Sequence, residues 1–140
     1  MPEESTTPDL AELFRRGFEA LDRRDFDAIM SSYAPGAVFD VSALGIGSFE
    51  GRETIRRHFE DWRAPYEEYE TDLEECRDIG NGVVFAVARQ TGRAPDGAGR
   101  IQQRPAFVSE WVEGLIVRVA VYDDIDEARA AAERLAQDRG

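Results

Sequence analysis

Two tight-turn signals in the second half of the chain constrain its fold more than any other feature. Asn81-Gly82 is a strong hairpin signal, and Glu113-Gly114 marks a second turn. The flanking segments alternate or are rich in β-branched and aromatic residues, which predicts four strands, over residues 66–79, 83–93, 100–112 and 115–124. Residues 94–99, "APDGAG", are predicted to form a loop. Strands joined in this way predict an antiparallel sheet.

The first half of the chain has helical spacing instead. An apolar stripe predicts a helix from about Pro8 to Arg23, and Asp25 is placed to cap a short helix that carries Tyr33 and ends at Pro35-Gly36. Residues 37–42 predict the first strand. A third helix begins near Gly51 and stops at Pro65, and residues 126–138 form a last helix with Ala128, Ala131 and Leu135 on one side.

This order of helices first and strands later predicts an α+β domain and argues against a parallel doubly wound sheet. We expect a curved, mostly antiparallel sheet wrapped on one side by three helices, with a cone-shaped cavity between the two layers and a C-terminal helix in addition. The 140 residues suit one domain, which we place at 8–137 after a flexible tail at 1–7.

Charge and composition exclude several classes of partner. The net charge of −12 argues against nucleic acids and anionic membranes, because phosphate binding needs a basic surface. The sequence contains no apolar run long enough for a membrane span and no signal-peptide pattern, so we expect a cytoplasmic protein. With one cysteine and one histidine, we predict no metal site and no cofactor. Neutral or cationic small molecules remain as ligands.

The order of elements resembles the SnoaL-like and ketosteroid isomerase-related branch of the nuclear transport factor 2-like superfamily. Four segments carry the resemblance, and they are "ALDRRDFDAIMSSYAPGAVFD", "FEGRETIRRHFEDW", "RDIGNGVVFAV" and "EWVEGLIVRVAVYDD". The resemblance covers about residues 8–137 and implies the cone-shaped fold. It also implies a hydrophobic pocket. All 17 basic residues are arginine, and this usage together with the fold suggests a bacterial protein. Members of the superfamily include isomerases, polyketide cyclases, epoxide hydrolases, dehydratases and non-catalytic ligand binders, so the fold alone does not select a function.

The family's catalytic residues transfer poorly to this chain. The tyrosine of the steroid isomerases falls near Gly17, and their protonated aspartate falls on Phe107 or Val108. Their carboxylate base falls on Asp40 only with a slip of one residue, and otherwise on Val41. The cyclases use a histidine and an aspartate on late strands, and the late strands here carry no histidine. The chain also offers no convincing Asp-Arg-Asp trio for epoxide hydrolysis. The resemblance therefore supports the fold and argues against authentic steroid isomerisation.

Asp40 and His58 are the two candidate catalytic residues. Asp40 lies in an apolar strand, where burial would raise the pKa of its carboxyl toward that of a general base. The alternative is an outward-facing carboxylate, which the alternation with Phe39 and Val41 favours. His58 lies beside the apolar stripe of the third helix, so it is either a boundary or surface residue or a proton-transfer group facing the cavity.

The remaining candidates are aromatic and polar residues that we expect to line the cavity and bind a ligand. Aromatic walls suit flat apolar ligands, and buried hydroxyl and amide groups need partners. The alternative for each residue is core packing, solvated sheet surface or a dimer contact. The ligand-binding candidates are Tyr33, Phe39, Trp62, Tyr69, Gln103, Phe107, Ser109 and Trp111.

These residues leave three functions open. The first is an enzyme without a cofactor, an isomerase, cyclase or hydrolase that performs acid-base chemistry on a small apolar metabolite with Asp40 as its base. The second is a non-catalytic binder that uses the same cavity. The third is an interaction domain with a filled cavity. We also predict a homodimer through the sheet face, because residues 115–122 are apolar on both faces.

Overall fold

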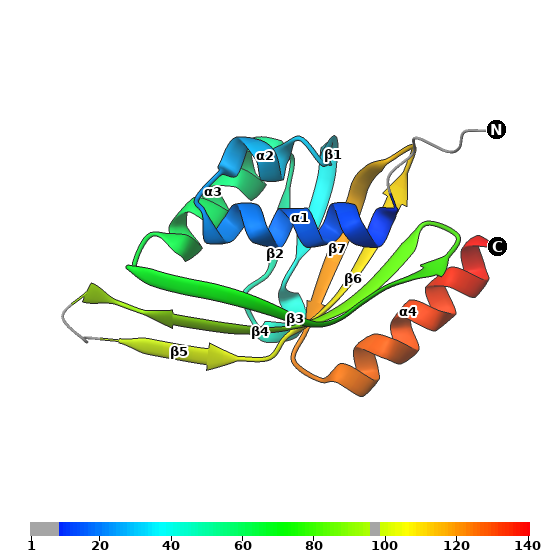
Figure 1. Ribbon diagram of the computed structural model, residues 1–140. Helices are drawn as coiled ribbons and strands as arrows, with labels where there is room; N and C mark the ends of the chain where they lie inside the picture. Colours follow the sequence, from blue (N-terminus) through cyan, green and yellow to red (C-terminus); the bar gives the residue numbers. More distant parts are fainter. Residues whose placement is uncertain (1–8, 96–98) are drawn as a thin grey trace, which may run out of the picture.

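The computed structural model of the chain describes residues 9–95 and 99–140, which form one curled sheet with helices on both faces (Figure 1). The flexible tail predicted at 1–7 and the centre of the 94–99 loop lie outside the described residues. The helices are α1 (Leu10–Asp22), α2 (Phe26–Met30), the 3-10 helix η1 (Ser42–Leu44), α3 (Arg52–Arg63) and α4 (Ile125–Arg139). The strands are β1 (Tyr33–Asp40), β2 (Ser48–Glu50), β3 (Glu68–Gly80), β4 (Val83–Arg93), β5 (Arg100–Gln103), β6 (Ala106–Val112) and β7 (Leu115–Tyr122).

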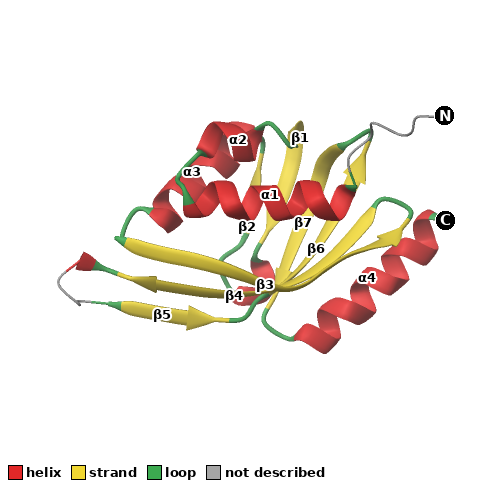
Figure 2. Ribbon diagram, in the orientation of Figure 1, coloured by secondary structure: helices red, strands yellow, loops and turns green. Residues whose placement is uncertain are grey.

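The sheet has the strand order β2-β1-β7-β6-β4-β3, and β5 pairs with the far half of β4. All pairs are antiparallel except β1 with β7, which joins the first strand to the last in parallel. Helices α1, α2 and α3 cover the concave face, whereas α4 lies on the opposite face (Figure 2). The predicted α+β fold with a curved, mostly antiparallel sheet is confirmed.

Both predicted hairpin turns are present, and their backbone explains their sequences. Asn81 and Gly82 have φ of 58° and 77°, and Glu113 and Gly114 have φ of 52° and 80°. Two successive positive φ values match the right-handed twist of the flanking strands. Gly82 is also required by space, because a Cβ atom there would lie 2.6 Å from the carbonyl oxygen of Trp111.

The predicted strand at 100–112 is wrong as a single element. Pro105 separates β5 from β6, and it offers no N–H to a strand ladder, although its carbonyl oxygen accepts the Ala88 amide at 3.1 Å. The first strand also begins earlier than predicted, at Tyr33, with Pro35 and Gly36 inside a register shift against β7. Tyr33 therefore belongs to a strand and not to the short helix. Strand β2 has only three residues and was not predicted.

Arg63 ties the helical layer to the sheet. Its side chain is 5% exposed and donates hydrogen bonds to the carbonyl oxygens of Leu21 (3.2 Å), Asp22 (3.0 Å) and Tyr66 (2.7 Å). Two of these carbonyls belong to the last turn of α1, whose carbonyl groups have no partner within the helix. The guanidinium group thus joins the ends of α1 and α3 to the start of β3, and this junction helps to fix the walls of the space between them.

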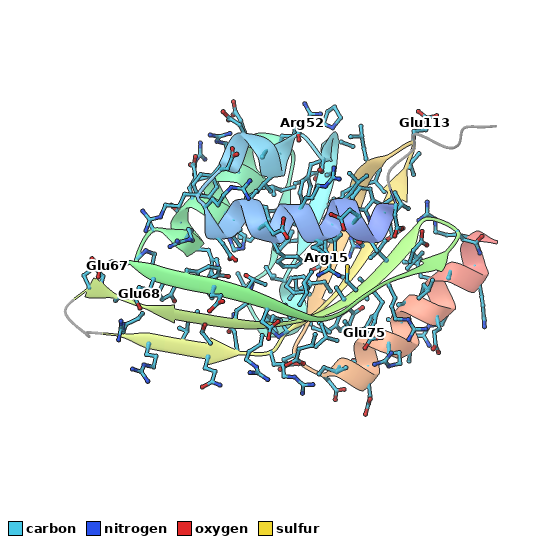
Figure 3. All side chains as sticks on the ribbon, in the orientation of Figure 1. Arg15, Arg52, Glu67, Glu68, Glu75 and Glu113 are labelled. Atoms are coloured by element: carbon cyan, nitrogen blue, oxygen red, sulfur yellow. The ribbon has the colours of Figure 1, made fainter. Side chains whose placement is uncertain are left out.

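Helix α4 packs on the outer face of the sheet through alanines. Ala128, Ala132 and Ala136 are buried there, whereas the predicted contacts Ala131 and Leu135 are only half-buried, because the buried stripe follows an i, i+4 spacing. Arg129 adds two 3.0 Å hydrogen bonds to the carboxylate of Glu75 on β3. Figure 3 shows Glu75 beside α4. The chain itself therefore covers part of the sheet face on which the dimer was predicted. None of the helices in the described residues is long and apolar enough to cross a bilayer.

Candidate functional site

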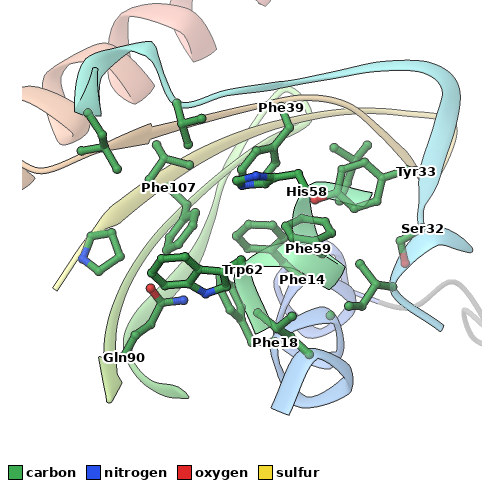
Figure 4. Close-up of a pocket in the computed structure, with 18 of the residues that line it drawn as sticks. Phe14, Phe18, Ser32, Tyr33, Phe39, His58, Phe59, Trp62, Gln90 and Phe107 are labelled. Carbon is green, nitrogen blue, oxygen red and sulfur yellow. The ribbon is translucent and has the colours of Figure 1, made fainter. Parts of the chain in front are cut away.

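The candidate site is a cavity of about 110 Å³ between the concave face of the sheet and helices α1, α2 and α3 (Figure 4). Most of its wall is apolar, and a cluster of aromatic side chains forms its centre. The aromatic residues without a polar group are Phe14, Phe18, Phe39, Phe59 and Phe107, joined by the indole of Trp62. The polar residues in the wall are Ser32, Tyr33, His58, Gln90 and Gln103. Among the described residues, those that line the cavity include no carboxylate.

Tyr33, at the start of β1, brings a buried hydroxyl group to the cavity. The residue is 4% exposed, its ring packs edge-on against Phe59 with centroids 6.1 Å apart, and burial raises the pKa of its hydroxyl. The hydroxyl points toward the centre of the cavity (Figure 4). No protein group in the described part of the chain hydrogen-bonds to it. A buried hydroxyl normally has a partner, so this one is available to a ligand or a water molecule.

His58 projects from α3 into the cavity wall, where it is half-buried. Its ring stacks on Phe49, with centroids 4.3 Å apart and planes 20° apart, and it also lies against Phe39 at 5.4 Å. Burial lowers the pKa of the imidazole, and the nearby charge of Asp61 opposes this shift. The imidazole is therefore neutral at pH 7 and can accept a proton.

The lowered pKa of His58 predicts a pH dependence of stability that one substitution should remove. The unfolded chain takes up the proton near pH 6.5, whereas the folded protein takes it up only at lower pH. The contribution of neutral His58 to the free energy of unfolding should therefore be fully present above pH 7. It should decrease as the pH falls through 6.5, by at most about 1.4 kcal/mol per pH unit.

Urea unfolding of wild type and His58→Phe at pH 7.5 and pH 5.0 measures this difference. His58 is the only histidine, so its ring protons also report its pKa directly by NMR. A ring pKa of 6.5 or above in the folded protein would contradict the buried position.

A hydrogen-bond chain behind the cavity wall holds the indole of Trp62 in place. The Trp62 Nε1–H donates to the Tyr69 hydroxyl at 3.1 Å. Next to it, the amide and hydroxyl of Thr71 donate to the carboxylate of Asp22 at 3.2 and 3.0 Å, and burial raises the pKa of that carboxyl. Tyr69 is buried but does not line the cavity, contrary to the expectation that it would form part of the wall. It supports Trp62 from behind.

Two further predicted cavity residues lie elsewhere in the core. Ser109 is fully buried, donates to the carbonyl oxygen of Val84 at 3.3 Å and accepts the Trp111 indole N–H at 2.9 Å. Neither Ser109 nor Trp111 lines the cavity. They point to the concave side as predicted, but they lie toward the Gly82 end of the sheet and satisfy each other's polar groups. The structure does place Tyr33, Phe39, Trp62, Gln103 and Phe107 in the wall.

Asp40 faces away from the cavity. Its carboxylate forms an ion pair with Arg118 of β7 and accepts hydrogen bonds from the amide (3.0 Å) and the hydroxyl of Ser42. These bonds to Ser42, and then Arg118, hold the pKa of the carboxyl below its usual value. The prediction that Asp40 lines the pocket is wrong, because the alternation of β1 directs Phe39 inward and Asp40 outward. A carboxylate that is ionised, paired and outside the cavity is not placed to act as its general base.

Replacing Asp40 by asparagine should therefore leave ligand binding by the cavity unchanged. The substitution removes the charge that pairs with Arg118, and we expect the free energy of unfolding to fall by about 1 kcal/mol. Urea unfolding measures the stability, and titration with toluene measures the binding. If Asp40→Asn is folded but binds toluene more than threefold more weakly than wild type, Asp40 is a residue of the site after all.

Sequence reasoning missed several wall residues, among them Gly17, Ser32 and Gln90. Gly17 lies on the inner side of α1, and no atom lies within 4 Å of the position that a Cβ atom there would occupy. Leu44 and Ile46 also line the cavity from the segment around η1, and Ile46 is 57% exposed at its mouth. A glycine on the apolar face of α1 was the available signal for Gly17. No periodic pattern marks a short loop such as the one that carries Ile46.

Comparison with known proteins identifies the family that the chain resembles. The SnoaL-like domain matches residues 14–119. Bal32a, from a soil-derived mobile gene cassette, is 20% identical, with 89% of this chain and 94% of that chain covered and a TM-score of 0.71. An NTF2-like protein from Cytophaga hutchinsonii is 17% identical, with 89% and 97% covered and a TM-score of 0.68. An LEH-like epoxide hydrolase from M. tuberculosis is 16% identical, with 89% and 90% covered and a TM-score of 0.69. No curated protein matches the chain. At these identities the structures support the fold alone.

Proposed function

The chain belongs to the SnoaL-like domain family, and we propose that its cavity binds a small, neutral, mainly apolar molecule. The observation that carries this proposal is the character of the wall. Its surface is apolar and aromatic, and its polar groups are uncharged at pH 7. Binding an ion there would bury a charge without a counter-charge, which is strongly unfavourable. The net charge of −12 further disfavours anions.

The size of the cavity limits the ligand to about one ring. An apolar cavity of about 150 Å³ holds a benzene molecule, and the cavity here is about 110 Å³ with an opening beside Ile46. Stacking and edge-on contacts with the surrounding phenylalanines favour a planar aromatic ring over an aliphatic chain. We therefore expect a ligand of one ring with at most one small substituent, part of which extends into the opening.

A titration with three single-ring compounds of different charge tests this proposal. Toluene, benzoate and benzylamine share the ring and differ in charge, and ¹H–¹⁵N NMR spectra report binding at the Trp62 indole and its neighbours. We expect saturable shifts with toluene that are confined to cavity residues, and much weaker binding of both ions. Equal or tighter binding of benzoate would contradict a site for neutral molecules.

Proton transfer by His58 is the second candidate function, and one observation favours it. His58 has a neutral imidazole in the cavity wall, within the same aromatic cluster as the Tyr33 hydroxyl that lacks a protein partner. An isomerase, cyclase or hydrolase without a cofactor would use His58 as base and Tyr33 as hydrogen-bond donor. This role replaces Asp40 in the predicted mechanism. Catalysis predicts that His58→Gln binds the same ligand with little change but loses turnover, whereas a binder would show no turnover in either protein.

The predicted homodimer stays a prediction, and the composition of the outer sheet face bears on it. Helix α4 covers β4 and β6 on the outer face, and the rest of that face carries ion pairs such as Arg104 with Glu74 and Arg118 with Asp40. A dimer through this face would use polar contacts around the exposed side chain of Val112. Light scattering at micromolar concentration should give twice the monomer mass, and the monomer mass would refute the dimer.

A further inference from the structure

Gln90 places a buried and unpaired amide group in the wall of the cavity. The residue is 5% exposed and belongs to β4. Its Oε1 atom accepts a hydrogen bond from Gln103 Nε2 at 3.1 Å. Its own Nε2 group carries two N–H donors, and they have no acceptor among the described residues of the protein. Buried donors without partners are rare, and each one calls for an explanation.

The Gln103 side chain accounts for one end of the Gln90 amide. Gln90 and Gln103 are directly opposite each other in the β4–β5 pairing, so their side chains lie on the same face of the sheet. Because Gln103 occupies the oxygen of Gln90, the Nε2 group is the end that remains free. Gln103 itself is exposed at the rim, where water can satisfy its other groups.

We propose that Gln90 is a specificity-determining residue, whose amide N–H donates to a carbonyl or ether oxygen on the ligand. This inference rests on the proposed function, and it adds that the small ligand carries a hydrogen-bond-accepting oxygen on its ring substituent. Figure 4 shows Gln90 beside Trp62 and Phe107, on the other side of the aromatic cluster from Tyr33 and Ser32. The oxygen of the ligand therefore lies at the Trp62 end of the cavity, with the ring against the phenylalanines.

Benzaldehyde and styrene form a matched pair of probes for this oxygen. Both are planar single rings of nearly the same shape, and they differ in an oxygen atom against a CH₂ group at one position. Their affinities are measured by NMR titration with wild type, Gln90→Leu and the control Gln102→Leu. Gln102 is exposed on the neighbouring position of β5, so it points to the opposite face from Gln103.

The two probes differ in hydration, but this difference is the same for every variant. A change in the ratio of their affinities between variants therefore reports the hydrogen bond alone. We expect the preference for benzaldehyde over styrene to fall about fivefold in Gln90→Leu, the size of one net hydrogen bond, and to stay unchanged in Gln102→Leu. In wild type, one of the Gln90 side-chain N–H signals should move downfield with benzaldehyde and not with styrene. This second readout needs no variant, so it holds even if Gln90→Leu folds poorly.

The outcomes separate this inference from the proposed function. If both probes bind but the ratio is the same in wild type and Gln90→Leu, and the Gln90 signal does not move, the inference is wrong and the apolar site stands. If neither benzaldehyde, styrene nor toluene binds the wild-type cavity, the proposed function itself is wrong.

Discussion

Replacing Gly17 with leucine is expected to close the cavity, eliminate saturable binding of toluene and stabilise the protein. Gly17 lines the cavity from α1, and the space that its side chain would enter is open for at least 4 Å. A leucine there gains helix propensity and buries apolar surface, so the free energy of unfolding should rise by about 1–2 kcal/mol. Urea unfolding and the toluene titration measure the two effects on the same protein.

Gly17→Ala is the matched control for this result. Alanine gives the same gain in helix propensity, about 1 kcal/mol, but its methyl group leaves most of the cavity open. The alanine variant should therefore be stabilised and still bind toluene. Undiminished toluene binding by Gly17→Leu would show that the ligand occupies another part of the molecule.

Replacing the buried Arg63 with methionine is expected to lower the stability of the protein more than replacing any other charged residue of α1, α2 or α3. The substitution leaves the carbonyl oxygens of Leu21, Asp22 and Tyr66 without their donor in a buried environment. It also removes the cation over the ring of Tyr69, 5.0 Å from its centroid. Losing these buried hydrogen bonds should lower the free energy of unfolding by about 3 kcal/mol.

Arg57→Met provides the control, because Arg57 lies on the same helix and is exposed. It should change stability by less than about 0.5 kcal/mol. Because the Arg63 junction fixes the relative positions of α1, α3 and β3, we also expect weaker toluene binding in Arg63→Met. If the two variants were equally stable, Arg63 would not hold the junction.

The sequence predicted the elements whose signals are local. The turn at Asn81-Gly82, the helix between Gly51 and Pro65 and the final strand are found where periodicity and turn chemistry place them. The break between β5 and β6 had a local signal, Pro105 itself, which the prediction of one strand over 100–112 did not use. The early start of β1 was missed because strand pairing across the sheet decides it. A local pattern contains no information about a partner that lies far away in the sequence.

The candidate site was harder to predict for the same reason. The alternation of β1 favoured an outward-facing Asp40, and this was correct. The choice of Asp40 as general base, because it is a carboxylate in an apolar strand, was wrong. His58 was expected more readily at the surface, and its place in the wall depends on stacking against Phe49 from a strand that was not predicted. Gln90 was not among the predicted site residues. Its unpaired amide becomes visible only with Gln103 opposite it.

A crystal structure of the protein soaked with bromobenzene would show directly whether the cavity holds a small neutral ring, because the anomalous signal of bromine locates the ring without ambiguity. We expect one strong bromine peak inside the cavity, among Phe59, Trp62 and Phe107, in wild type and none there in Gly17→Leu. A wild-type cavity without a peak, or with its space filled by rearranged aromatic side chains, would contradict the claim that this protein binds a small neutral molecule there.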